Sequence, residues 1–271
     1  MFEKVKEAVA FLKKEGFEGS KTAIILGTGL GGLVNHIEIT KTINYSDIPH
    51  FPISTMEFHK GKMILGTLEG KLIIAMQGRF HYYEGYSMAE VVMPVRVMKY
   101  LGVEKLLISN AAGNMNMDWK KGQLMLLRDH INLQPDNPLR GSDAAMFGQI
   151  FTDMSEPYNQ KLNEILTAAA LSKNIPLNKG IYVAVSGPNL ETKAEYRFLR
   201  NAGADVVGMS TVPEVIAANQ IGLPVAAISV LTDDCDPDNL MPINIEEIIK
   251  TAESAEKDLI AIIRQFMVLN G

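Results

Sequence analysis

The chain has 271 residues and a formal net charge of −5, and it contains no run of Lys and Arg that would predict binding to nucleic acid or to an anionic membrane. The single cysteine, Cys235, excludes an internal disulfide, and the charged segment 1–16 lacks the apolar centre of a signal peptide, so we expect a cytoplasmic protein. No apolar stretch reaches the length of a transmembrane helix.

Apolar residues at helical spacing predict a helix within the first 16 residues, followed by an apolar strand at 22–26. The strand runs into Gly27-Thr28-Gly29-Leu30-Gly31-Gly32, which matches the G-x-G-x-x-G pattern of dinucleotide-binding proteins. That pattern needs an acidic residue at the end of a second strand, and here Asp47 falls in a proline-broken loop. We therefore reject dinucleotide binding and keep a loop whose backbone N–H groups and Thr28 hydroxyl can approach an anion.

Two apolar strands at 63–68 and 72–76 have the spacing of a hairpin. The loop after them, residues 78–86, holds more polar and aromatic side chains than a connection needs. Arg79 and His81 flank one aromatic residue, and in an extended segment they point to the same side. One interpretation is a surface loop whose side chains are bonded locally. The other is an anion clamp, in which Arg supplies a fixed fork of donors.

A capping box at Ser87–Glu90 begins a helix that runs to about residue 101, and Pro94 predicts a kink in it or a later start. The strand predicted at 105–109 ends in Asn110-Ala111-Ala112-Gly113. Small residues after a buried strand let a flat ligand approach closely, although they are also typical of a tight turn under a helix.

After a strand at 123–127, the segment 129–153 is rich in Asn, Pro and Gly, and loops of this length are commonly lids or interfaces. Phe147, in the middle of it, is a candidate to cover a pocket of its own chain or of a neighbour. A helix at 158–173 and a strand at 180–185 follow.

The stretch Ser186–Val215 combines a loop, a helix, a short strand at 205–208 and the start of a second helix. Glu191 lies where the loop meets the first helix. Thr211–Glu214 has the pattern of a capping box, which places Ser210 at a helix N-terminus, where unpaired N–H groups favour an anion. Two ordinary helix caps explain the same residues equally well.

The last strand, 224–231, ends in Thr232-Asp233-Asp234, and Asn244 and Glu247 open the final helix. No internal repeat, low-complexity tract or linker divides the chain, so we expect a single domain over residues 1–271. The alternation of strands and helices predicts the α/β class, with a mixed central β-sheet, partly barrel-like, flanked by helices on both sides.

In one sheet, the polar segments that follow four of these strands would meet at one edge. They would supply an anion site together with two carboxylates, Glu191 and Asp233, that suit N–H groups. The ligand that fits this combination joins an anion to a nitrogen heterocycle.

Several motifs, in order along nearly the whole chain, resemble the trimeric, low-molecular-mass class of purine nucleoside phosphorylases. They are residues 22–33, Phe51-Pro52-Ile53-Ser54-Thr55 with His59, 78–86, 109–113, Asp129-His130-Ile131-Asn132-Leu133, 187–196 and 203–215. The resemblance implies a homotrimer, without metal or cofactor, that uses inorganic phosphate as co-substrate. It would cleave purine nucleosides to the free base and (deoxy)ribose 1-phosphate, a reaction of purine salvage.

The resemblance also implies roles for individual residues, of which His81, Glu191 and Asp233 would be catalytic. Glu191 would accept the N1 hydrogen of a 6-oxopurine, Leu190 would pack on the ring with Asp233 nearby, and Phe147 would close the pocket of an adjacent subunit. The phosphate site would comprise Thr28, His59, Arg79, His81, Ala111 through its backbone N–H, and Ser210, and the sugar site Tyr83, Asn110 and Met209.

Three positions depart from the family pattern. Asp233 replaces the usual Asn, and an ionised Asp only accepts hydrogen bonds, which favours a purine protonated at N7 or one with a 6-amino group. Ile245 replaces a usual His and cannot bond the ribose 5′-hydroxyl. Leu190 replaces a common Phe. The first two changes also occur in methylthioadenosine phosphorylases, so that activity, or an adenosine-accepting variant, is the main alternative.

Two further alternatives are a nucleoside-binding protein without turnover and a hydrolytic nucleosidase. The set of phosphate donors argues against the first, and a hydrolase would not need Arg79 and His81 together around an oxyanion. The residues alone do not rank inosine, guanosine, adenosine and methylthioadenosine as substrates.

Overall fold

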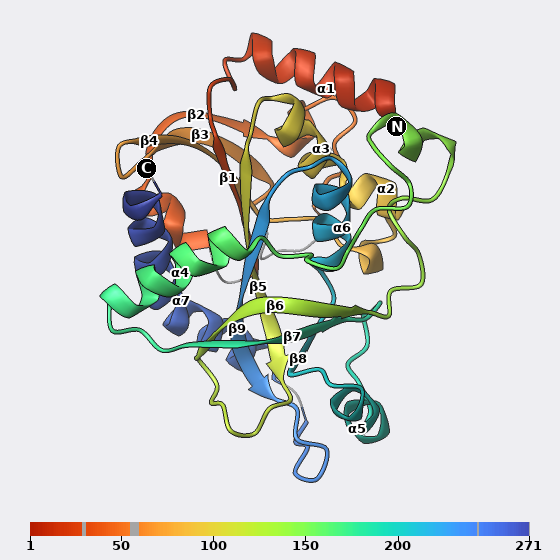
Figure 1. Ribbon diagram of the computed structural model, residues 1–271, viewed down its shortest axis with the longest axis vertical. Coiled ribbons are helices and arrows are strands. Elements are labelled where there is room, and N and C mark those ends of the chain that lie inside the picture. Colours follow the sequence, from red (N-terminus) through yellow and green to blue (C-terminus); the bar gives the residue numbers. More distant parts are fainter. Residues whose placement is uncertain (29–30, 55–59, 243, 271) are drawn as a thin grey trace.

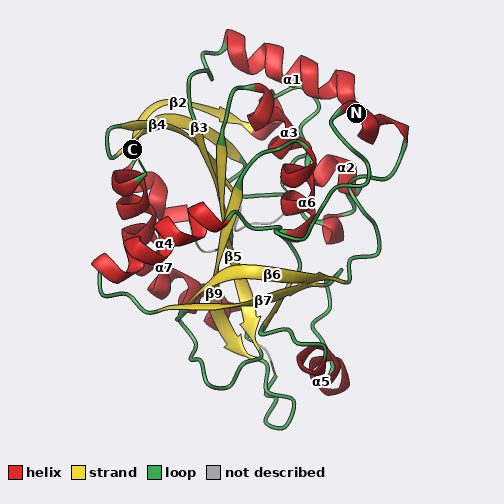
Figure 2. Ribbon diagram, viewed as in Figure 1, coloured by secondary structure: helices red, strands yellow, loops and turns green. Residues whose placement is uncertain are grey.

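The computed structural model describes residues 1–28, 31–54, 60–242 and 244–270. Within these residues, a nine-stranded β-sheet crosses the molecule and helices lie on both sides of it (Figures 1 and 2). The strands are β1 (Thr22–Leu26), β2 (Glu38–Asn44), β3 (Lys62–Leu68), β4 (Lys71–Gln77), β5 (Lys105–Asn114), β6 (Leu124–Asn132), β7 (Leu177–Ala184), β8 (Val206–Gly208) and β9 (Val225–Asp234).

The sheet is mixed and partly closed. Its order is β2-β3-β4-β1-β5-β8-β7-β6-β9, and β9 also pairs with β5 in parallel. This last pairing closes β5, β8, β7, β6 and β9 into a barrel, while β2, β3, β4 and β1 extend from it as an open sheet. The predicted single-domain α/β class with a partly barrel-like mixed sheet is therefore confirmed.

The helices cover opposite faces of the sheet because its central strands are apolar on both faces. Alternate residues of β1 belong to two different clusters: Ile25 packs with α1 (Phe2–Lys14), α3 (Met93–Tyr100) and α6 (Val212–Gln220), whereas Ile24 packs with α4 (Gln160–Ser172) and α7 (Ile245–Leu269). The remaining helices are α2 (Met88–Val91), α5 (Lys193–Asn201) and the 3₁₀ turns η1 (Gly31–His36), η2 (Tyr45–Asp47), η3 (Tyr82–Glu84) and η4 (Ser142–Met146).

Three strands run further than predicted. β5 continues through Asn110-Ala111-Ala112-Gly113, β9 continues through Thr232-Asp233-Asp234, and β6 extends to Asn132. The polar residues expected on loops therefore lie on hydrogen-bonded strands. This follows from the barrel, because β5 pairs with β9 along this whole stretch, with an irregularity between Ala112 and Gly113.

Among the helices of the described residues, including the 25-residue α7, none combines the length and the apolar character needed to cross a bilayer.

Candidate active site

A cavity of about 340 Å³ lies beside the ends of β5, β8 and β9. These strands share one hydrogen-bonded framework, so residues far apart in the sequence meet there. The predicted site residues that line it are Thr28, Arg79, His81, Tyr83, Asn110, Ala111, Leu190, Glu191, Met209, Ser210 and Asp233, together with Ile245. His59 lies outside the described residues.

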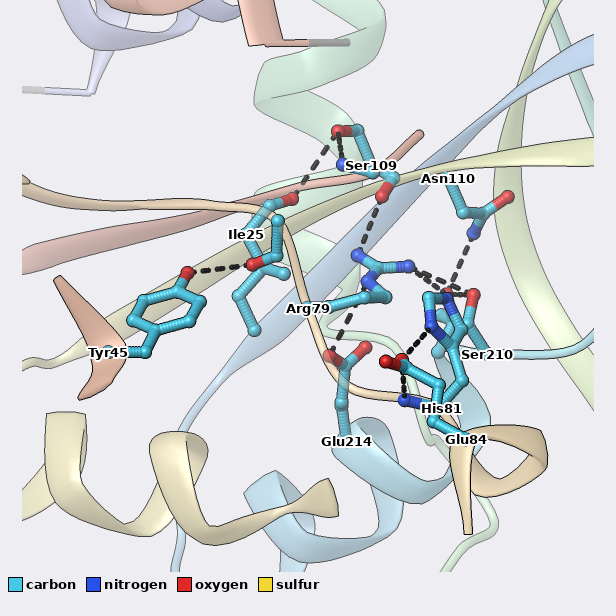
Figure 3. Close-up of polar contacts among 12 residues, drawn as sticks. Ile25, Tyr45, Arg79, His81, Glu84, Ser109, Asn110, Ser210 and Glu214 are labelled. Atoms are coloured by element: carbon cyan, nitrogen blue, oxygen red, sulfur yellow. Dashed lines mark hydrogen bonds and ion pairs between the residues drawn. The ribbon is translucent and has the colours of Figure 1, made fainter. Parts of the chain in front are cut away.

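Arg79 lies two residues after the end of β4 and is 2% exposed. Its Nη1 donates to Ser210 Oγ at 2.9 Å and its Nη2 donates to the Ser109 carbonyl at 2.7 Å (Figure 3). These bonds fix the plane of the guanidinium against β5 and the start of α6. The result is a fixed cation in the lining of the cavity, as the anion-clamp interpretation requires.

His81 is held by Glu84 from the next turn of the chain. The carboxylate accepts from the His81 backbone N–H at 2.9 Å, and its Oε1 lies 2.8 Å from His81 Nδ1 (Figure 3). Tyr83 stacks on the imidazole with a centroid separation of 4.6 Å. Burial lowers the pKa of His81, and Arg79 acts in the same direction, while the bond to Glu84 opposes them. Burial also raises the pKa of Tyr83 to about 12.

α6 begins where the capping box at Thr211–Glu214 was predicted, but the predicted hydrogen bond from a helix N–H to the Thr211 hydroxyl is wrong. Thr211 has a φ of 66° and its hydroxyl caps no N–H of the helix. Instead its Oγ1 accepts from Asn110 Nδ2 at 2.9 Å and from Arg79 Nη1 at 3.3 Å. The site therefore takes the hydroxyl that the helix would otherwise use. Asn110 is fixed from its other side, because Ser229 donates to its Oδ1 at 2.7 Å.

Glu214 was predicted only as a capping residue, but its carboxylate also lies beside the guanidinium of Arg79. It is 3% exposed, and its Oε1 lies 3.6 Å from Arg79 Nε. Burial raises the pKa of Glu214, and Arg79 opposes that shift. A glutamate at the third position of a helix is read from sequence as a cap, so only the fold reveals this contact.

Two carboxylates also line the cavity: Glu191 lies just before α5 and Asp233 lies near the end of β9. Asp233 accepts from Thr232 Oγ1 at 2.7 Å and from Cys235 Sγ at 3.3 Å. Burial raises the pKa of Glu191, and a hydrogen bond from its own backbone N–H opposes this. Tyr196 and Cys235 also line the cavity, and nothing in their sequence context predicted it.

The prediction that Phe147 covers a neighbouring subunit needs correction. Its side chain is 8% exposed and packs inside its own chain, 5.2 Å from Phe2 and with the Arg96 guanidinium 4.0 Å from its ring centroid. The exposed aromatic of the same loop is Phe151, at 96%. Two phenylalanines four residues apart in a loop without periodicity cannot be assigned to core or surface from sequence.

Residues 21–267 match the family model of the phosphorylase superfamily. The chain belongs to this superfamily. It is 47% identical to purine nucleoside phosphorylase 1 of Bacillus subtilis, over 97% of each chain, and 42% identical to the purine nucleoside phosphorylase of Bos taurus, over 95% of this chain and 92% of that one.

Solved structures of purine nucleoside phosphorylases have the same fold as this chain. The chain superposes on Schistosoma mansoni purine nucleoside phosphorylase in complex with adenosine with a TM-score of 0.92, at 38% identity over 98% of this chain and 96% of that one. The isoform 2 enzyme of the same organism, in complex with cytosine and ribose-1-phosphate, gives the same TM-score, identity and coverage. Among the described residues of this chain, no group of His, Cys, Asp and Glu side chains has the arrangement of a metal site.

Proposed function

We propose that the protein is a purine nucleoside phosphorylase that converts purine (deoxy)ribonucleosides and phosphate into the free base and (deoxy)ribose 1-phosphate. The observation that carries this is one cavity lined by both a fixed, buried Arg79 and two carboxylates, Glu191 and Asp233. The named relatives, all purine nucleoside phosphorylases over nearly the full length of the chain, support the same reaction.

The chemistry follows from these two kinds of group in one cavity. Cleavage of the C1′–N9 bond passes through an oxocarbenium-like state, which needs an anionic oxygen beneath C1′ and stabilisation of the departing purine. Arg79, His81, Ser210 and Thr28 hold phosphate, with the Ala111 N–H and His59 completing the set. Asn110, Tyr83 and Met209 hold the sugar between phosphate and base.

In the base site, Glu191 and Asp233 bond the purine edge and Leu190 packs on the ring. A methylthioadenosine phosphorylase is the second candidate, and one contact favours it or an adenosine-accepting enzyme. Both oxygens of Asp233 already accept hydrogen bonds, which suits an amino group of the ligand. Ile245 lines the cavity with an apolar side chain. This suits a sugar whose 5′ substituent needs no hydrogen-bond partner, as in methylthioadenosine.

The working assembly is a homotrimer that needs no metal or cofactor and acts in the cytoplasm. Its support is the apolar surface of the 133–153 loop, where Met146, Ile150 and Phe151 are exposed. Exposed apolar side chains that lie together are typical of an interface between subunits. Phe151, rather than Phe147, is then the residue that reaches a neighbour's cavity.

The test is release of the base from inosine, guanosine, adenosine and methylthioadenosine, each with and without phosphate. We expect cleavage only with phosphate, and with inosine or guanosine among the substrates. Cleavage without phosphate would indicate a nucleosidase, and turnover of methylthioadenosine alone would establish the second candidate.

A further inference from the structure

One buried hydroxyl joins three residues of the cavity lining without lining the cavity itself. Thr211 is 1% exposed, and its Oγ1 accepts from Arg79 Nη1 at 3.3 Å and from Asn110 Nδ2 at 2.9 Å. The same oxygen lies 3.1 Å from Ser210 Oγ. Arg79, Asn110 and Ser210 all line the cavity. In Figure 3, the side chains of Arg79 and Asn110 both point toward Ser210, the residue before Thr211.

The backbone at Thr211 is held in a strained conformation. Its φ is 66° and its ψ is −55°, and the Val212 N–H donates to the Ser210 carbonyl at 2.7 Å, which closes a one-residue turn of a rare kind. A branched side chain at a positive φ is unfavourable, and strained residues cluster at functional sites. This turn places the Thr211 hydroxyl between Arg79 and Asn110 instead of on the first N–H groups of α6.

We propose that Thr211 is a positioning residue whose hydroxyl fixes Ser210 as a hydrogen-bond donor to the anion and orders the anion and sugar subsites together. This inference rests on the function proposed above and adds a residue that affects the binding of both substrates. Thr211 acts through Ser210, Arg79 and Asn110, because its own side chain does not line the cavity.

The direction of each hydroxyl hydrogen follows from counting donors and acceptors, since a hydroxyl offers two lone pairs and one hydrogen. Both lone pairs of Thr211 Oγ1 accept, from Arg79 and Asn110, so its hydrogen is donated to Ser210 Oγ. Ser210 Oγ also accepts from Arg79 Nη1 at 2.9 Å, which uses its second lone pair. The hydrogen of Ser210 is therefore available to an acceptor in the cavity, and a phosphate oxygen is such an acceptor.

Asn110 is ordered by the same threonine oxygen. Its Nδ2 donates one hydrogen to Thr211 Oγ1, and its Oδ1 accepts from Ser229 Oγ at 2.7 Å. Thr211 and Ser229 are both buried, so the amide is held between two fixed groups. This leaves the second hydrogen of Nδ2 for the sugar. Loss of the Thr211 hydroxyl would remove an acceptor from Arg79, a donor from Ser210 and an anchor from Asn110.

Thr211→Val tests the proposal, because it removes the hydroxyl and keeps a branched side chain of similar size. The kcat/KM for phosphate should fall about tenfold, the value of one hydrogen bond to a charged group, and KM for inosine should rise through Asn110. Thr211→Ser keeps the hydroxyl and should restore both values toward those of the unmodified protein. Thr211→Ala removes the same hydroxyl with a smaller side chain, and it gives the same comparison if Thr211→Val does not fold.

A double mutant separates positioning from a loss of packing. In a Ser210→Ala background the donor that Thr211 orients is already absent, so adding Thr211→Val should lower kcat/KM for phosphate far less than it does alone. A packing defect would lower it equally in both backgrounds. Equal losses in the two backgrounds, or an unchanged KM for inosine in Thr211→Val, would overturn the proposal.

The matched control is a threonine hydroxyl away from the cavity. Thr167 Oγ1 donates to the Asn163 carbonyl at 2.7 Å on α4, and Thr167 is not part of the cavity lining. Thr167→Val should therefore change neither kcat/KM for phosphate nor KM for inosine.

Binding of inorganic phosphate alone, measured by calorimetry, requires no turnover. Thr211→Val should weaken it about tenfold, and Thr211→Ser should leave it close to that of the unmodified protein. An unchanged phosphate affinity in Thr211→Val would refute the role of the hydroxyl. If the unmodified protein binds phosphate but releases no base from any nucleoside, the proposed function fails, whereas weaker phosphate binding by Thr211→Val would still support the ordering of the anion subsite.

Discussion

Arg79 has its guanidinium plane fixed before any ligand arrives. A planar fork held by Ser210 and the Ser109 carbonyl offers donors in a fixed direction, and no reorganisation is needed when charge develops. We therefore expect Arg79→Ala to lower kcat/KM for phosphorolysis about 100-fold or more, the cost of one preorganised donor. Steady-state kinetics with varied phosphate measure this.

Arg264 provides the matched control, because it is an exposed arginine paired with Glu69 and lies outside the cavity lining. Arg264→Ala should keep the activity of the unmodified protein. Near-normal phosphorolysis by Arg79→Ala would remove Arg79 from the phosphate site.

The pKa of His81 is lowered from its ordinary value of 6.5 by burial, so the folded protein prefers the neutral ring. As the pH falls below that value, the unfolded chain takes up a proton first, and stability is lost with falling pH. His81→Gln removes this contribution. The free energy of unfolding of the unmodified protein should thus fall more steeply than that of the variant between about pH 7 and pH 5.

Urea unfolding at a series of pH values measures both slopes. The buried ring of His130, whose pKa is also lowered, is present in both proteins and cancels in the comparison. A steeper loss in the variant would contradict the neutral state assigned to His81.

Site residues could be predicted from the sequence where the neighbouring residues already indicate a binding role. Arg79, His81 and Glu191 stand in segments with more polar groups than a connection requires, and all three line the cavity. Glu214, Tyr196 and Cys235 could not be predicted, because each becomes relevant only through a partner that the fold brings to it. Their local context indicates a helix cap, a helix face and a lone thiol.

Among the elements, α5 is the helix whose start adjoins the base site. Thr192 accepts from the Glu195 N–H at 3.2 Å, and Glu195 accepts from the Thr192 N–H at 2.7 Å, one residue after Glu191. We expect Thr192→Ala to lower the free energy of unfolding by about 1 kcal/mol and to raise KM for the nucleoside.

The control is the equivalent cap on a helix away from the cavity. Asn159 accepts from the Leu162 N–H at the start of α4, so Asn159→Ala should cost a similar free energy, about 1 kcal/mol, with no change in KM. KM and denaturation curves are measured for both variants. If Thr192→Ala and Asn159→Ala change KM equally, the cap of α5 acts through stability alone.

Periodicity predicted most elements, including the hairpin of β3 and β4, the capping box of α2 and the break at Pro94. It missed β2, whose side chains are mostly exposed and show no clean alternation. It also ended β5 and β9 too early, because polar and small residues resemble a loop. Strand pairing across the barrel, a property of distant segments, overrides that local signal.

At the scale of the whole molecule, the proposed trimer predicts a solution mass three times that of the chain. Phe151 is 96% exposed, so Phe151→Ser should leave the fold intact and raise KM for the nucleoside if a neighbour's cavity receives the ring. Light scattering measures the mass and kinetics measure KM. Leu171→Ser, a change at another exposed apolar residue on α4, should affect neither.

A monomer with full activity would contradict the assembly. If the protein is a trimer and the Phe151→Ser variant has an unchanged KM for the nucleoside, only the role of Phe151 would be contradicted.

The barrel shares β5 with the open sheet, since this strand pairs with β1, β8 and β9. In this closed ring of strands, two neighbouring strands cannot separate unless the hydrogen bonds between another pair of strands also break. We therefore expect Asn110 on β5, Met209 directly after β8 and Asp233 on β9 to keep a constant spacing during turnover. Substrate and product should therefore enter and leave by way of segments that adjoin the cavity outside the ring, 186–192 and 236–242. In deuterium exchange, amides of the ring should label slowly in every state, while those two segments label quickly and slow down when nucleoside binds.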